Sequence, residues 1–370
     1  MTDRIPTDGA SARGREVLAP GEDRDATDAT DATDTPVRWG VLGAANIAVR
    51  RMIPALQNGA RSRVVAIASR DIGKARAAAD ALGIPRAYGS YEELLADPDV
   101  EAVYNPLPNH LHVPWSLRAA EAGKHVLCEK PIALSAAEAR TLVAARDRAG
   151  VQVGEAFMVR THPQWLAVRE LIEAGRIGEL RLVVGHFSYY RRDPADIRSR
   201  PDYGGGALMD VGCYPITMSR WLFGAEPVGV IAMLERDPEF GVDRLASALL
   251  RFPLGQASFT CAGQLVHYQR MQVLGTRGRI EVPVPFSPPA DHRVRIIVDD
   301  GRDVLGGGNE TFELPAADQF ALQGERFSAA VRGRGTVPVA LEDAIANMAV
   351  IDALFRSAET GRWESPARLL

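Results

Sequence analysis

Lysine is scarce in this sequence, and the scarcity makes each lysine worth examining. Of the 43 basic residues only Lys74, Lys124 and Lys130 are lysines, and the other 40 are arginines. Arginine keeps its proton at any ordinary pH, whereas the pKa of a desolvated lysine can be tuned for chemistry. A lysine in this chain is therefore a candidate for a functional role.

Cysteine, long apolar runs and excess charge are also lacking. The three cysteines are far apart and odd in number, which disfavours a disulfide framework and a structural zinc site; we expect no metal and a cytoplasmic location. No apolar run approaches the roughly 20 residues of a membrane span. The net charge of −4 gives no support for a nucleic-acid partner. The 370 residues, 46% of them hydrophobic, are enough for two folded domains.

Residues 1–36 have no hydrophobic periodicity and hold nine acidic residues against four arginines. Such a segment buries too little apolar surface to offset its ordering entropy, so we expect a disordered acidic tail. It lacks the apolar stretch or twin-arginine start of a secretion signal. A solubilising tail and a partner-binding arm both remain open as its role.

Two different patterns of strands and helices follow the tail. Residues 37–156 alternate short apolar strands with helices, which predicts an α/β domain with a doubly wound parallel sheet. Residues 157–370 hold many extended runs and two closing amphipathic helices, which predicts an α+β domain with a large, mostly antiparallel open sheet. Because helices cover only one face of that sheet, we expect a homodimer or homotetramer that associates through the other.

A glycine turn joins the first expected strand to the first expected helix. The dinucleotide-binding fingerprint at such a turn is G-x-G-x-x-G/A, and the chain keeps its first glycine and last alanine. An alanine replaces the middle glycine, but the helix N-terminus still offers N–H donors to a pyrophosphate. An ordinary strand-to-helix turn is the alternative. The candidate cofactor residues here are Gly43, Ala44, Ala45, Asn46 and Ile47.

The end of the second strand carries Ser69 and Arg70 where an NAD-binding chain carries an acid. A guanidinium pairs bidentately with a 2′-phosphate, and Lys74 adds positive charge one helical turn later. These residues favour NADP as the cofactor, with NAD as the alternative. Arg70 as a merely solvated residue at a helix start is the other interpretation.

Charged and polar residues also gather where later strands end. Glu129-Lys130-Pro131 follows a buried strand, at the edge where ligands bind in parallel sheets. A charged pair there is costly unless it meets a ligand, so we favour a functional site over a surface ion pair. Farther on, three glycines precede Asp210 and Tyr214, which share a helix face at a spacing of four. A phenol beside a lysine suits acid–base catalysis because the cation lowers its pKa; a helix cap and a core tyrosine are the alternative.

The segments Gly40–Ala48, Glu129–Pro131 and Gly204–Tyr214 resemble the Gfo/Idh/MocA oxidoreductase family, over about residues 37–365. The similarity is greatest to the branch of NADP-dependent D-xylose dehydrogenases, dimeric dihydrodiol dehydrogenases and glucose-fructose oxidoreductase. Tyr214 stands where many members have histidine, which argues against a typical inositol dehydrogenase. The resemblance implies a Rossmann domain followed by a substrate-binding and dimerisation domain.

The resemblance also implies roles for particular residues. Lys130, Tyr214 and Asp210 are implied as catalytic, with Tyr214 as the proton donor or acceptor. Contacts to the cofactor are implied for Ser69, Arg70 and Lys74 at the 2′-phosphate and for Leu107, Pro108, Asn109, His112, Glu129 and Lys130. The substrate side is implied to include Arg160, His162, Tyr190 and Arg198.

The expected function is a reversible, NADP-dependent hydride transfer between nicotinamide and a carbinol of a sugar, polyol or cyclic diol, similar to D-xylose 1-dehydrogenase. In this mechanism Tyr214 takes the hydroxyl proton while Lys130 lowers the tyrosine pKa and holds the oxygen. Two alternatives stay open. One is a cofactor-binding sensor or regulator without turnover, and the other is an oxidoreductase that never releases its NADP.

Overall fold

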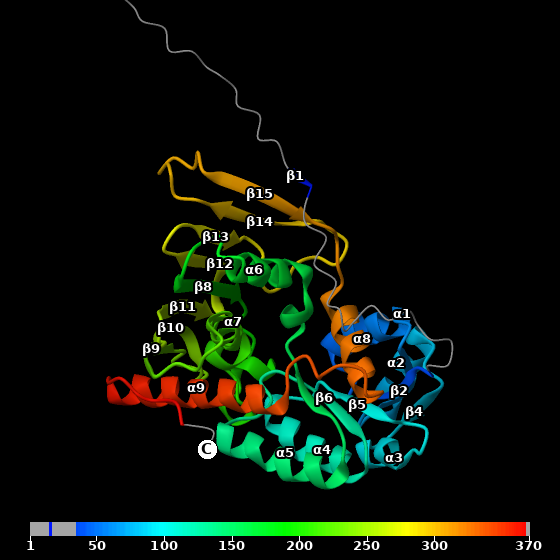
Figure 1. Ribbon diagram of the computed structural model, residues 1–370. Coiled ribbons are helices and arrows are strands. Elements are labelled where there is room, and N and C mark those ends of the chain that lie inside the picture. Colours follow the sequence, from blue (N-terminus) through cyan, green and yellow to red (C-terminus); the bar gives the residue numbers. More distant parts are fainter. Residues whose placement is uncertain (1–14, 17–34, 368–370) are drawn as a thin grey trace, which may run out of the picture.

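The computed structural model describes residues 15–16 and 35–367 (Figure 1). Most of the expected disordered tail, residues 1–14 and 17–34, lies outside the described residues. Residues Arg15–Glu16, however, form a short strand, β1, which pairs in parallel with β15 (Asn309–Leu314). The free edge of β15 offers backbone hydrogen bonds, and these do not require the apolar side chains that the tail lacks.

A six-stranded, entirely parallel sheet forms the first domain, in the order β4-β3-β2-β5-β6-β7. The order reverses between β2 and β5, and ligands bind at the carboxyl ends of strands at such a switch point. The strands are β2 (Val37–Leu42), β3 (Ser62–Ala68), β4 (Arg86–Tyr88), β5 (Ala102–Asn105), β6 (His125–Glu129) and β7 (Val153–Ala156).

Helices cover both faces of this sheet, as the alternating sequence predicts (Figure 1). Their boundaries follow local signals. The Asp71 side chain caps the second helix by accepting hydrogen bonds from backbone N–H groups in its first turn. Ser90 and Glu93 form a capping box on the third helix. The helices are α1 (Ile53–Asn58, after a π-helical turn at Ala48–Met52), α2 (Ile72–Leu82), α3 (Tyr91–Ala96), α4 (His112–Glu121) and α5 (Ala136–Ala149).

The second sheet has nine strands in the described residues, in the order β1-β15-β14-β13-β12-β8-β11-β10-β9. All neighbours are antiparallel except β8 with β11 and β1 with β15. Helices α6 (Pro163–Glu173) and α7 (Cys213–Phe223) lie along it. The remaining strands are β8 (Leu180–Tyr190), β9 (Gly229–Arg236), β10 (Asp243–Arg251), β11 (Gln256–Ala262), β12 (Gln264–Gly275), β13 (Arg279–Val282) and β14 (Val294–Asp299).

The last two helices pack against the first domain. The domain boundary expected after residue 156 assigns them to the second domain and does not anticipate these contacts. Helix α9 (Leu341–Thr360) packs against β9, α5 and α7, and α8 (Gln319–Val331) packs on α1. Phe327 of α8 lies 5.5 Å from the ring of Trp39 in the first sheet, and Ser328 accepts a hydrogen bond from the Trp39 indole. Residues 319–331 therefore belong to the core of the first domain. No helix in the described ranges is long and apolar enough to cross a membrane.

Candidate active site

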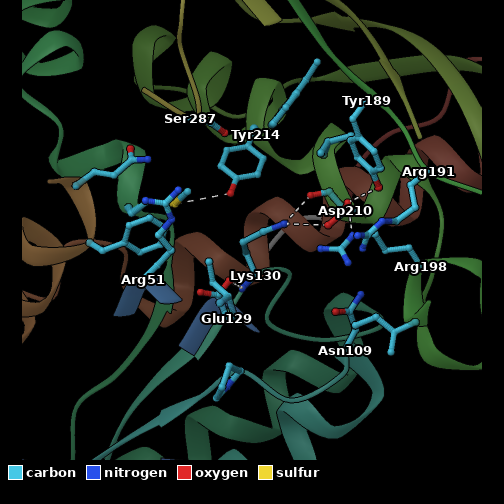
Figure 2. Close-up of a pocket in the computed structure, with 18 of the residues that line it drawn as sticks. Arg51, Asn109, Glu129, Lys130, Tyr189, Arg191, Arg198, Asp210, Tyr214 and Ser287 are labelled. Atoms are coloured by element: carbon cyan, nitrogen blue, oxygen red, sulfur yellow. Dashed lines mark hydrogen bonds and ion pairs between the residues drawn. The ribbon is translucent and has the colours of Figure 1, made fainter. Parts of the chain in front are cut away.

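A cavity of about 960 Å³ lies where the carboxyl edge of the first sheet meets β8 and the start of α7. Lys130 enters it from the first domain, and Asp210 and Tyr214 enter it from the second (Figure 2). Three residues separated by up to 84 positions in the chain are thus brought to one space. The convergence that the sequence predicts for these side chains is present in the structure.

Lys130 follows β6 and is held by the backbone and side chain of one residue. Its Nζ donates to the carbonyl oxygen of Asp210 at 2.7 Å and to Asp210 Oδ1 at 3.2 Å. Burial alone would lower the pKa of Lys130, but Tyr214 and Asp210 outweigh it and raise the pKa. The amine is therefore a fixed positive charge at neutral pH. The Lys130–Pro131 peptide bond is cis.

Asp210 is the charged centre of the site. It lies in a π-helical turn, Leu208–Gly212, directly before α7. Its Oδ2 accepts from the Tyr189 hydroxyl at 2.6 Å and from Arg198 Nε at 2.8 Å. Burial opposes its ionisation, but the charges of Lys130 and Arg198 hold the pKa of Asp210 well below its usual range. Asp210 therefore positions two cations and a phenol and does not itself exchange a proton near neutral pH.

Tyr214 has a packed ring and a nearly free hydroxyl. The ring contacts Phe157, Phe187 and Phe286 at centroid distances of 5.2, 5.5 and 5.4 Å. Within the described part of the chain its hydroxyl has one weak partner, the Sδ atom of Met158 at 3.7 Å. The packing fixes the direction of the hydroxyl without occupying it, which suits a group that exchanges a proton with a ligand.

The electrostatics of Tyr214 differ from the expectation. Lys130 Nζ lies 5.0 Å from the centroid of the tyrosine ring and does lower the pKa. Burial is the larger effect, however, and the pKa of Tyr214 is raised above its ordinary value. The loss of hydration destabilises the buried phenolate more than the nearby ammonium stabilises it, so Tyr214 holds its proton at neutral pH. It is a ready proton donor, and it becomes a base only as the pH rises.

The residues behind Lys130 hold its turn in place. Glu129 accepts from the Tyr104 hydroxyl at 2.6 Å and from the Lys130 backbone N–H at 3.2 Å. The two ring nitrogens of His112 lie 2.7 Å from the Pro131 carbonyl oxygen and 2.6 Å from that of Leu107. Burial lowers the pKa of His112 to about 4 although both carbonyls favour the charged ring, so the ring is neutral and its single N–H donates to one carbonyl. His112 is therefore packed between two walls of the cavity and bonds one of them.

The turn after β2 fits a dinucleotide. Gly43 has φ +90°, a conformation that other residues rarely adopt, and a Cβ there would lie 3.0 Å from Leu107. The following backbone, Ala44–Ile47, is accessible, and among the described residues no side chain caps the helical turn that begins at Ala48. The N–H groups at a helix start of this kind can bind a phosphate. Of the five candidate residues in this turn, Ile47 also lines the cavity.

The residues after β3 fit the terminal phosphate of NADP. Asp71, the nearest acid, accepts from the backbone N–H groups of Gly73 and Lys74 and so serves as a helix cap. Ser69 is buried, and its hydroxyl accepts from the Asp71 N–H at 3.2 Å. Arg70 and Lys74 are exposed beside it. Because Asp71 is engaged as a helix cap, the charge available here comes from Arg70 and Lys74. These two cations suit a 2′-phosphate better than a free ribose hydroxyl.

Most of the expected residues around the reaction centre line the cavity, and two on the substrate side do not. Arg160 is turned away: its guanidinium pairs with Asp343 at 3.3 Å and covers the Trp221 ring. His162 is buried and caps α6 by accepting from the Gln164 N–H. The Arg160 side chain is therefore used in packing and the His162 side chain in helix capping, and neither lines the cavity. Pro108 is likewise absent from the lining, which includes the expected residues Leu107, Asn109, His112, Glu129, Tyr190 and Arg198.

Sequence reasoning missed several lining residues. Tyr189 is the most informative, because it bonds Asp210 directly whereas its neighbour Tyr190 is 69% exposed at the rim. Strand alternation was the available signal: Phe187 points into the core, so Tyr189 shares its face. Other missed residues include Arg51, His267 and Ser287, which come from a helix and from segments of the second domain that no motif marks.

These features define a two-domain oxidoreductase that uses a dinucleotide. Residues 37–157 match the oxidoreductase family with an NAD-binding Rossmann fold, GFO_IDH_MocA, and residues 165–281 match the GFO/IDH/MocA C-terminal domain. The chain is 49% identical to an uncharacterized oxidoreductase of Rhizobium meliloti, over 89% of this chain and 99% of the relative. The chain belongs to the Gfo/Idh/MocA family of NAD(P)-dependent oxidoreductases.

Several similar proteins have named activities. The D-xylose 1-dehydrogenase (NADP(+)) 2 of Haloferax volcanii is 41% identical over 87% of this chain and 98% of its own. Among solved structures, a 3-ketoreductase from Actinomadura kijaniata in complex with NADP and TDP-benzene aligns with a TM-score of 0.82 at 34% identity, covering 87% of this chain and 98% of its own. The aldose-aldose oxidoreductase of Caulobacter crescentus aligns with a TM-score of 0.81 at 30% identity, over 90% and 100% of the two chains.

Proposed function

We propose that the protein is an NADP-dependent oxidoreductase that interconverts a carbinol and a carbonyl on a small, uncharged sugar, polyol or cyclic diol. The observation that carries the proposal is the meeting of Lys130, Asp210 and Tyr214 in one cavity beside the dinucleotide turn. A fixed cation and a free phenol at one place can bind a substrate oxygen and exchange its proton.

The chain's own residues provide a place for the cofactor. The N–H groups after Gly43 would bind the pyrophosphate, and Arg70 with Lys74 would bind the 2′-phosphate. Leu107, Glu129 and Lys130 would surround the nicotinamide end. When bound, the nicotinamide supplies or accepts the hydride. The use of NADP by the xylose dehydrogenase relative and its presence in the solved 3-ketoreductase support the same choice here.

Each residue of the site has a distinct task. Lys130 donates a hydrogen bond to the substrate oxygen and stabilises negative charge as it develops there. Tyr214 gives its proton to that oxygen in reduction and recovers it in oxidation. Asp210 keeps Lys130 in place through two hydrogen bonds. Because Tyr214 retains its proton at neutral pH, reduction is favoured kinetically there and oxidation accelerates as the pH rises.

The charges in the cavity favour an uncharged substrate. Lys130 and Arg198 are paired with Asp210, and Arg191 with Asp196. Arg51 and Asp291 also line the cavity, and the charge of Arg51 contributes to lowering the pKa of Asp291. Among the described residues, three of the four lysine and arginine side chains of the lining are thus paired with carboxylates, whereas a substrate diphosphate would need charge-assisted partners. A free aldose, polyol or diol fits this balance better than a nucleotide-linked sugar.

Self-association is part of the proposal. The outward face of the second sheet carries exposed apolar side chains, including Met233 at 77% and Leu249 at 47% exposure. These residues lie on adjacent antiparallel strands, β9 and β10. A second copy of the chain that covers this face would form a homodimer, or a homotetramer with further contacts.

A coupled absorbance screen of aldoses, inositols and aromatic dihydrodiols with NADP and with NAD tests the function. We expect NADP reduction with at least one neutral sugar or diol and little with NAD. Cofactor binding without turnover across the panel would instead favour a sensor. Reduced cofactor that remains bound through gel filtration, seen by its near-ultraviolet absorbance, would favour an oxidoreductase that does not release NADP.

A further inference from the structure

Glu155 is a buried carboxyl group that the proposed chemistry does not use. It lies on β7 beside Cys128 of β6, at the carboxyl edge of the sheet, and is 2% exposed. Its Oε1 accepts from the Ile132 N–H at 2.7 Å. Its Oε2 is buried and has no hydrogen-bond partner in the part of the chain that the structure describes. Such an unpartnered polar atom is uncommon in a protein interior and calls for a reason.

The bond to Ile132 completes the support of the Lys130 turn. Lys130 N–H is held by Glu129, the Pro131 carbonyl faces His112, and Ile132 N–H is held by Glu155. The first two contacts fix the entry and the middle of the turn, and the third fixes its exit. Glu155 is not among the residues that line the cavity. Its influence on the reaction must therefore pass through the position of Lys130.

The surroundings of Glu155 disfavour its negative charge. Burial is the largest effect, and Asp343 and Glu129 add to it. The Ile132 N–H and the charge of Arg220 favour the ionised form but do not outweigh burial, so the pKa of Glu155 is raised to about 8. Arg220 is itself shared with Glu226 and Asp343, so little of its charge remains for Glu155. The titratable and charged groups around the carboxyl come from β6, α7 and α9, and are Cys128, Glu129, Cys213, Arg220 and Asp343.

We propose that Glu155 is a positioning residue that anchors the Lys130 turn while protonated and loosens it on ionisation, so that the active site responds to mildly alkaline pH. A buried carboxylate without a paired cation gains stability by reaching water. The Ile132 N–H binds the ionised carboxylate more strongly than the neutral acid, but the cost of burial is larger. The carboxylate therefore moves toward water, the contact with Ile132 opens, and the exit of the Lys130 turn is released. The turnover part of this inference rests on the proposed function, whereas the stability part does not.

Unfolding by denaturant between pH 5 and 9 tests the titration. Glu155→Gln keeps the shape and the acceptor for Ile132 but cannot ionise. Between the ordinary glutamate pKa of 4.5 and about 8, the unfolded chain ionises Glu155 while the folded chain does not. The wild-type folding constant should therefore fall, relative to that of the variant, by up to about tenfold per pH unit, and level off above pH 8. A ratio that stays constant with pH would overturn the proposal.

Reduction of a carbonyl substrate by NADPH between pH 6.5 and 9.5 tests the coupling. In this direction Tyr214 remains protonated, so its own titration does not shape the profile. Wild-type kcat should decline above pH 8, and Glu155→Gln should keep its neutral rate and lose that decline. Glu155→Leu, which removes the acceptor, should lower kcat about tenfold or more at pH 7, with NADPH binding changed only slightly, and the Gln variant should restore it.

The outcomes separate the two proposals. A decline that persists unchanged in Glu155→Gln would overturn the coupling even if the enzyme is active. Absence of turnover with every substrate would contradict the proposed function and leave the unfolding comparison as the decisive test of Glu155. If Glu155→Leu does not fold, the Gln comparison alone decides. Glu121→Gln at the exposed end of α4, outside the cavity lining, serves as the control and should behave as wild type in both assays.

Discussion

Replacing Tyr214 by phenylalanine removes one oxygen atom from the site and leaves the ring in place. The ring packs among three phenylalanines, and the hydroxyl contacts the Met158 sulfur at 3.7 Å, its one hydrogen-bond partner among the residues that the structure describes. The free energy of unfolding should therefore change by less than about 1 kcal/mol. The loss of a positioned proton donor should lower kcat by about 10²- to 10⁴-fold, roughly 2.7 to 5.4 kcal/mol in the barrier.

The pH dependence makes this prediction sharper. Because the pKa of Tyr214 is raised, its ionised fraction grows about tenfold per pH unit at neutral pH. Wild-type oxidation should accelerate accordingly between pH 6 and 8, and Tyr214→Phe should lose that rise while binding NADP normally.

Steady-state rates in both directions, together with fluorescence titration of NADPH, measure these effects. Tyr268→Phe, outside the cavity lining, is the matched control and should retain wild-type rates. If Tyr214→Phe kept more than a third of the wild-type kcat, or kept the rise with pH, the assignment of Tyr214 as the proton-exchanging group would be wrong.

Three further variants test the other parts of the site. Lys130→Met should lower kcat by about 10²-fold or more with NADP affinity changed only a few-fold, because the substrate oxygen loses its cation; stopped-flow reduction and fluorescence titration measure the two effects. Asp210→Asn should lower the free energy of unfolding by about 3 kcal/mol, because Lys130 and Arg198 lose their shared carboxylate; a denaturant titration with an unchanged midpoint would contradict this. Arg70→Ala with Lys74→Ala should weaken NADP binding about tenfold or more and leave NAD binding nearly unchanged, because only NADP carries the 2′-phosphate; equal loss for both cofactors in a binding titration would refute the phosphate assignment.

Local signals explain why the first domain could be predicted in detail. Most strands from Val37 to Ala156 are short apolar runs, and caps such as Asp71 mark where helices begin. The short edge strand β4 (Arg86–Tyr88) is an exception, because its three residues are only partly buried and form no apolar run. The fingerprint turn and the Lys130 segment then lie at the carboxyl edge because every strand of the sheet is parallel. Chain order and parallel pairing together are enough to place these motifs near one another.

Contacts between distant segments explain what could not be predicted. The packing of Phe327 on Trp39 joins residues 288 positions apart, and no periodicity in either segment shows it. Arg160 follows the strand that ends at Ala156, but its direction depends on Asp343 in a helix near the end of the chain. The raised pKa of Tyr214 likewise depends on burial by three aromatic rings from separate segments. Residue type and spacing indicated which groups meet, whereas tertiary packing determines their charge and orientation.

The central claim is that Lys130 and Tyr214 act on the same substrate oxygen in the cavity between the two sheets. A crystal structure of the protein with NADP and a sugar or diol identified by the screen measures this directly. The account predicts that one oxygen of the reacting carbon lies within about 3.2 Å of both Lys130 Nζ and the Tyr214 hydroxyl. A substrate oxygen that contacts neither group, or a nicotinamide bound outside this cavity, would contradict it.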